Sequence, residues 1–89
     1  MVLVDVREPF EMAIADLPEV GQLRIPMGQF MARLPELDPG DELVIYCRSG
    51  SRSGKVVRKL QQIGFEKVWN LKGGVLAWRQ DVDPSLRAY

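Results

Sequence analysis

The chain has 89 residues, of which 46% are hydrophobic and 27% charged, a composition typical of one small globular domain. It has no apolar run of membrane-spanning length and no basic-then-apolar signal pattern at its start. With no histidine and one cysteine, it excludes an internal disulfide, a histidine-based metal site and a Cys-His or Ser-His pair. We therefore expect a cytoplasmic protein with no metal and no cofactor.

The net charge is zero, but the charge is unevenly distributed. Residues 1–45 carry three basic and nine acidic side chains, whereas residues 46–89 carry nine basic and three acidic ones. The basic half favours anionic substrates or an acidic partner surface, although a solvated face has the same pattern. Because no aromatic side chains are interleaved with the basic ones, we expect no nucleic-acid partner, and we expect no membrane partner either.

The first half of the chain predicts two strands and two helices. Residues 2–6 predict a buried strand that ends in a carboxylate, and residues 8–14 a short helix with proline in its first turn. A loop at 17–21 precedes a short strand at 22–25. Residues 27–34 predict a helix that turns Phe30, Met31 and Leu34 toward the core. A polar turn follows at 35–41.

The second half continues the alternation. Residues 42–46 predict the central strand, and the helix after residue 53 is expected to end at Gly64. A strand at 67–71, a helix at 75–80 introduced by Gly73-Gly74, and a tail at 81–89 complete the chain. Strands alternating with helices predict an α/β fold, a single domain over residues 1–89, with a central parallel sheet and helices on both faces.

The loop after the central strand carries the candidate site. Ligands of open α/β sheets bind at the carboxyl ends of strands, where Cys47 stands. Gly50 and small neighbours let backbone N–H groups form an anion-binding concavity, and a helix N-terminus with Arg48 and Arg52 adds positive charge. This field should lower the thiol pKa from its ordinary value of about 8.5. We predict that Cys47 is a nucleophile, although a lone cysteine is more often a small buried hydrophobe. The predicted substrate-binding residues are Arg48, Ser49, Gly50, Ser51, Arg52 and Ser53.

Three segments resemble the rhodanese (thiosulfate sulfurtransferase) domain family. They are Asp5-Val6-Arg7-Glu8-Pro9, residues 44–53 around Cys47, and residues 70–78. They occur in the family's order and spacing and cover nearly the whole chain. The resemblance implies that Cys47 becomes a persulfide cradled by the N–H groups of residues 48–53. It also implies close approach of Gly73-Gly74 to the loop and an anchoring role for Trp78.

Residues 81–89 are similar to the C-termini of rhodanese domains fused behind E1-like adenylyltransferases, which sulfurate ubiquitin-like sulfur-carrier proteins. Two departures from the family stand out. Family members usually have a strand and a short helix ahead of the Asp5 segment, so we expect an excised or shortened domain with one sheet edge left bare. The usual Gly-His-Ile-Pro-Gly-Ala segment is replaced by residues 15–22, so no role of its histidine carries over.

The resemblance implies a sulfurtransferase that moves sulfane sulfur through a Cys47 persulfide. The expected donor is thiosulfate or a protein persulfide, such as that of a cysteine desulfurase. The expected acceptor is thiophilic, and a ubiquitin-like sulfur-carrier protein is one candidate.

Three alternatives can be weighed against this interpretation. A non-catalytic interaction module would not need Cys47 and two arginines. A phosphatase or arsenate reductase of Cys-x5-Arg design has its arginine where this chain has Ser53. A nucleotide-binding P-loop at 50–56 fails on spacing, because three residues instead of four separate its glycines and Val56 follows the lysine.

Two other charged groups have simple structural explanations. Asp5 and Arg7 are expected to tie the end of the first strand through hydrogen bonds and an ion pair. Lys55, Arg58 and Lys59 form a basic helix face that is either solvated or a docking surface for a protein donor or carrier.

Overall fold

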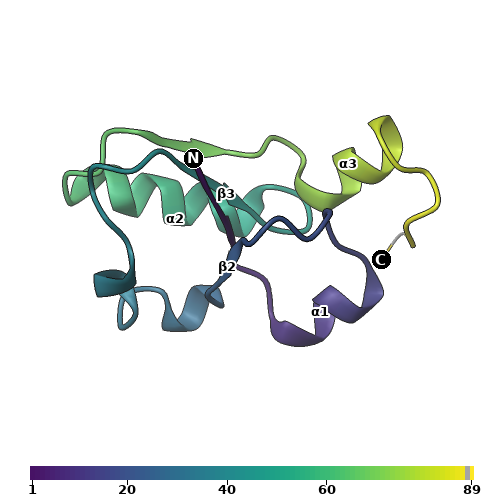
Figure 1. Ribbon diagram of the computed structural model, residues 1–89, viewed down its shortest axis with the longest axis horizontal. Coiled ribbons are helices and arrows are strands. Elements are labelled where there is room, and N and C mark those ends of the chain that lie inside the picture. The colour runs from purple at the N-terminus through teal and green to yellow at the C-terminus, as the bar shows by residue number, and fades with distance from the viewer. Residues whose placement is uncertain (88) are drawn as a thin grey trace.

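The computed structural model describes residues 1–87 and 89 and contains a parallel sheet in the strand order β2-β1-β3-β4. The strands are β1 (Val2–Asp5), β2 (Leu23–Arg24), β3 (Leu43–Tyr46) and β4 (Val68–Asn70). The helices are α1 (Pro9–Ile14), α2 (Ser51–Gln62) and α3 (Gly74–Asp81), with 3-10 turns η1 (Met27–Gln29) and η2 (Leu34–Glu36) (Figure 1). The predicted α/β fold is confirmed. No helix in the described ranges is long and apolar enough to cross a bilayer.

Two apolar clusters lie on opposite faces of the sheet, because successive side chains of a strand point to opposite sides. Leu43 and Ile45 of β3 are fully buried in the cluster under α2, which contributes Leu60. Tyr46 belongs to the second cluster, together with Val75 of α3. Each large apolar side chain buried this way contributes roughly 1.5–3 kcal/mol. Helices therefore cover both faces, as predicted.

The strand register brings the carboxyl ends of β1, β2 and β3 together. Asp5 pairs with Tyr46 on one side and with Arg24 on the other. Arg7 follows β1 and Cys47 follows β3, so both leave the sheet at this same edge. The candidate site thus lies where the strand ends meet.

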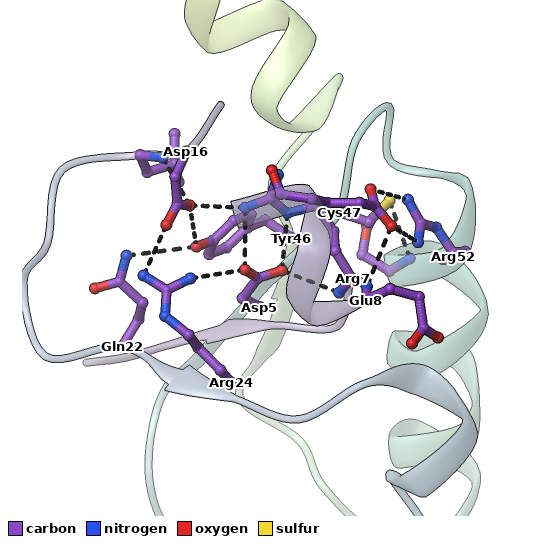
Figure 2. Close-up of polar contacts among 12 residues, drawn as sticks. Asp5, Arg7, Glu8, Asp16, Gln22, Arg24, Tyr46, Cys47 and Arg52 are labelled. Carbon is purple, nitrogen blue, oxygen red and sulfur yellow. Dashed lines mark hydrogen bonds and ion pairs between the residues drawn. The ribbon is translucent and has the colours of Figure 1, made fainter. Parts of the chain in front are cut away.

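A buried ion-pair network closes this edge (Figure 2). Arg7, only 2% exposed, donates to Asp5 at 3.0 and 3.1 Å and to the Ala15 carbonyl at 2.7 Å. Arg24 donates to Asp5 at 2.8 Å and pairs with Asp16 at 2.7 Å. Because a buried charge is costly without partners, the opposite charges of this network offset one another's cost of burial. The expected tie between Asp5 and Arg7 at the strand end is confirmed.

The prediction of a helix over residues 27–34 is wrong. The segment forms two separate 3-10 turns, in which backbone N–H groups bond to carbonyls three residues back, as Phe30 does to Met27. Gly28 weakens helix formation, and the residue before the proline at position 35 is disfavoured in helical geometry. Phe30 is buried as expected, but Met31 is 49% exposed.

The segment expected as a tail is partly packed against the domain. Leu86 and Tyr89 lie against the second apolar cluster, and the Leu86 carbonyl accepts a hydrogen bond from Arg79 at 2.6 Å. Trp78 packs in the same cluster, which confirms its expected anchoring role.

Gly74 allows α3 to approach the Cys47 loop closely. The N–H groups of Val75 and Leu76 donate to the carbonyls of Cys47 and Arg48, each at 3.0 Å. A Cβ on Gly74 would stand 2.2 Å from the Cys47 carbonyl oxygen, and its φ of +56° lies in the left-handed region. The predicted close approach of Gly73-Gly74 to the loop is confirmed.

Replacing Gly74 should therefore damage the fold at the site. We expect Gly74→Ala to lower the free energy of unfolding by at least about 3 kcal/mol, because it combines left-handed strain with a backbone clash. Gly21→Ala is the control, since φ is +80° there but no atom lies within 4 Å of the added Cβ. It should cost about 1–2 kcal/mol. Urea unfolding measures both, and equal losses would contradict the packing argument.

Candidate active site

Cys47 connects the buried end of β3 to the first turn of α2. Gly50 precedes that helix with a φ of +100°, a conformation that favours glycine and turns its N–H toward the loop interior. Cys47 is 1% exposed and belongs to the apolar cluster under α2, as a small core hydrophobe would. The atoms around its sulfur distinguish it from such a residue.

Three hydrogen-bond donors converge on Cys47 Sγ. The Gly50 N–H lies at 3.1 Å, the Ser53 N–H at 3.5 Å and the Ser53 hydroxyl at 3.3 Å. Burial, the largest single influence, raises the pKa of the thiol. Hydrogen bonds from Ser53 and from the backbone of Gly50 and Ser49 outweigh it, so the pKa of Cys47 lies below its ordinary value. The loop itself favours the thiolate.

Asn70, at the end of β4, adjoins this group. Its Nδ2 donates to the Gly50 carbonyl at 3.1 Å, and its Oδ1 accepts from the Ser53 hydroxyl at 2.6 Å. A hydroxyl has one proton, so Ser53 donates either to Asn70 or to the sulfur. The two backbone N–H groups are therefore the sulfur donors that face no such competition.

Arg52 is paired with Glu11 of α1, and among the described residues it makes no hydrogen bond to the Cys47 sulfur. Its two terminal guanidinium nitrogens donate to the two carboxylate oxygens at 2.6 and 2.8 Å. Glu11 is 5% exposed, accepts from the Glu8 N–H at 3.1 Å and closes the capping box of α1. The hydrogen bond from Arg52 lowers the pKa of Glu11 to about 2, against the effect of burial. This pair ties α1 to the loop.

Arg48 is engaged by Tyr89. Its guanidinium carbon lies 5.2 Å from the Tyr89 ring centroid, and its Nε donates to the Tyr89 carbonyl oxygen. The Tyr89 hydroxyl accepts from Arg7 at 2.7 Å and donates to Glu11 at 2.9 Å. Both arginines that were expected to surround the thiol thus have protein partners.

The structure brings part of the predicted site together. Cys47, Gly50 and Ser53 form its centre, Ser49 contributes through its backbone, and Ser51 is an exposed first residue of α2. Sequence reasoning missed Glu11, Asn70 and Tyr89 as neighbours of the site. The spacing of Glu8 and Glu11 signals a capping box, and Asn70 stands at a strand end, but nothing local marks Tyr89. No group of three or more acidic or cysteine side chains within residues 1–87 and 89 could hold a metal ion.

Comparison with known proteins assigns the family. The family described as "Rhodanese-like domain" matches residues 1–81. The chain belongs to the rhodanese-like domain family. A protein named "Sulfurtransferase" from Allochromatium vinosum is 41% identical over 78 residues, which cover 88% of this chain and 71% of that protein.

Other rhodanese-like proteins match in fold or over most of the chain. The crystal structure of a rhodanese-related protein from Thermoplasma volcanium superposes with a TM-score of 0.81 and 26% identity, covering 91% of this chain and 78% of that one. "Adenylyltransferase and sulfurtransferase MOCS3-2" of Zea mays is 34% identical over 99% of this chain but only 19% of its own length. The expected similarity to adenylyltransferase-fused rhodanese domains is confirmed, and the relatives support a sulfurtransferase-type role.

The Ser53 hydroxyl provides a test of how the thiolate is stabilised. In Ser53→Ala a donor is lost, so the thiol pKa should rise and alkylation by iodoacetamide on the acid side of the titration should slow by about threefold. Ser51→Ala, which removes an exposed hydroxyl of the same loop, should leave the titration unchanged. An unchanged thiol pKa in Ser53→Ala would mean that the Ser53 hydroxyl donates to Asn70 and not to the sulfur.

The Glu11–Arg52 pair should make stability depend on pH. Because the pKa of Glu11 falls from 4.5 to about 2 on folding, its contribution is present above pH 4.5 and is lost as the pH falls toward 2. Between about pH 5 and pH 2, the wild type should lose about 3 kcal/mol more unfolding free energy than Glu11→Gln. Urea unfolding across this range measures the difference. Glu36→Gln, which breaks an exposed pair with Arg33, should follow the wild type; parallel profiles for all three proteins would refute the assignment.

Proposed function

We propose that this chain is a sulfurtransferase whose Cys47 thiolate takes up a sulfane sulfur and passes it to a thiophilic acceptor. The observation that carries the proposal is the convergence of the Gly50 and Ser53 donors on Cys47 Sγ at the start of α2. Donors already in place stabilise negative charge on sulfur without reorganisation. The similarity to the Allochromatium vinosum sulfurtransferase supports the same activity.

Thiosulfate illustrates the chemistry. The thiolate attacks the outer sulfur, the sulfur–sulfur bond of thiosulfate breaks, and its electron pair leaves with sulfite. Cys47 then carries a persulfide anion, whose charge the loop N–H groups stabilise. A nucleophile such as cyanide attacks the terminal sulfur, and the electron pair of the broken bond restores the thiolate.

Burial of the thiol adds a condition to this mechanism. Because Cys47 is 1% exposed, a donor reaches the sulfur only when the loop opens locally. Ser49 and Ser51 are exposed, so the loop itself faces solvent. A persulfide formed beneath it would be shielded from water and from other thiols.

The donor and acceptor are proposed by class. As donor we propose thiosulfate or the persulfide of a protein such as a cysteine desulfurase. As acceptor we propose a ubiquitin-like sulfur-carrier protein, the class that the resemblance to adenylyltransferase-fused rhodanese domains implies. The reducing cytoplasm, where a free thiol persists, is the compartment that suits this chemistry.

A phosphatase is disfavoured by the same geometry. Hydrolysis of a phosphate ester in a cysteine loop requires a guanidinium free to hold the phosphate oxygens. Arg52 is instead held by both oxygens of Glu11, and position 53 is a serine.

Replacing the thiol tests the function directly. Cys47→Ser should lower thiosulfate-to-cyanide sulfur transfer at least about 100-fold, because the hydroxyl cannot form a persulfide. Thiocyanate formation measures the rate, and mass spectrometry of the thiosulfate-treated wild type should detect one added sulfur atom on Cys47. Unchanged transfer in the variant would rule out the assignment. Absence of the added sulfur would favour an interaction module, and turnover of p-nitrophenyl phosphate a phosphatase.

A further inference from the structure

A groove of about 140 Å³ lies between η1 and α2. Figure 1 shows the segment that carries η1 running beneath α2, and the two elements are in contact. The groove is lined by Met27, Phe30, Met31, Lys55, Val56 and Lys59. Phe30 and Val56 are buried, whereas Met27 and Met31 are 38% and 49% exposed. Its apolar surface is therefore open to solvent.

Two lysines stand at the rim of this apolar surface. Lys55 and Lys59 are four residues apart on α2, so they lie on one side of the helix. Both are exposed, and neither ammonium group takes part in a side-chain hydrogen bond or an ion pair found among residues 1–87 and 89. Exposed methionines adapt to varied apolar partners. The combination fits a ligand that places an apolar side chain between carboxylates.

We propose that this groove binds an acidic–apolar segment of the protein that gives sulfur to Cys47 or takes it away. The assignment of this partner rests on the proposed sulfurtransferase function. Charge complementarity selects an acidic segment, because residues 46–89 carry six more basic than acidic side chains and the groove rim adds no carboxylate. A small anion such as thiosulfate does not suit an apolar floor.

The groove is placed to bring such a partner to the thiol. The helix rises about 1.5 Å per residue, so Lys55 lies about 6 Å along the axis from Ser51, where the Cys47 loop ends. A segment in the groove can reach the loop with about two more extended residues. Docking and sulfur transfer would thus share the N-terminal half of α2.

A synthetic peptide tests the groove without sulfur chemistry. The probe is a hexapeptide with Leu-Phe flanked on each side by Asp and Glu, titrated into the reduced wild type while NMR follows the methionine methyl groups. Resonances of Met27 and Met31 should shift, and added salt should weaken binding. The double variant Lys55→Glu/Lys59→Glu should raise the peptide Kd about tenfold. Arg58→Glu/Lys67→Glu, with the same change in net charge outside the groove, should bind nearly as the wild type does.

The outcomes separate the alternatives. No binding, equal loss in both double variants, or shifts elsewhere than Met27 and Met31 would overturn the proposal. Shifts that depend on protein concentration without peptide would overturn it in favour of a second copy of this chain. Thiosulfate-to-cyanide transfer by Lys55→Glu/Lys59→Glu should stay within about twofold of the wild type. A wild type that transfers sulfur but does not bind the peptide would reject the groove alone, and a wild type that binds the peptide but does not transfer sulfur would reject the sulfurtransferase function alone.

Discussion

The hydrogen bonds that converge on the Cys47 sulfur are the interaction on which the site depends. A thiol with 1% exposure in an apolar cluster should resist ionisation, because burial disfavours the charged form. Hydrogen bonds from the Ser53 hydroxyl and from backbone N–H groups of the loop reverse this preference, and they act at short range in surroundings that exclude water. The same donors that favour the thiolate would stabilise a persulfide anion. Burial and a lowered thiol pKa therefore coexist at this residue.

The rest of the structure holds this loop in position. On one side, α3 donates N–H groups to the Cys47 and Arg48 carbonyls, an approach that needs Gly74. On the other side, Glu11 of α1 holds Arg52. The two arginines of the loop thus bind neighbouring parts of the chain, and the sulfur is stabilised by the hydrogen bonds of Ser53 and of the loop backbone.

Much of the fold could be predicted from local sequence. The apolar run before Cys47 predicted β3, and the polar, glycine-containing loop that follows predicted a helix start, because both features arise within a few neighbouring residues. The helix predicted over residues 27–34 was wrong, although it rested on a local pattern of the same kind. The apolar spacing suited a helix, but Gly28 and the neighbouring prolines disfavour one. Local patterns could therefore place the nucleophile but not every element around it.

The partners of the two arginines could not be predicted. Arg52 meets Glu11 across 41 positions and Arg48 meets Tyr89 across 41 positions, contacts that only the folded chain creates. Sequence reasoning assigned both guanidinium groups to the thiol because they stand beside it in the chain. It also overlooked Asn70, whose proximity to Ser53 follows from the pairing of β3 with β4.

The ultraviolet absorbance of the thiolate, followed against pH in the wild type, tests this account most directly. The account predicts a single transition, absent from Cys47→Ser, with a midpoint below the pKa of a free cysteine side chain. A midpoint at or above that of free cysteine would show that burial outweighs the loop donors, and it would contradict the assignment of Cys47 as the nucleophile.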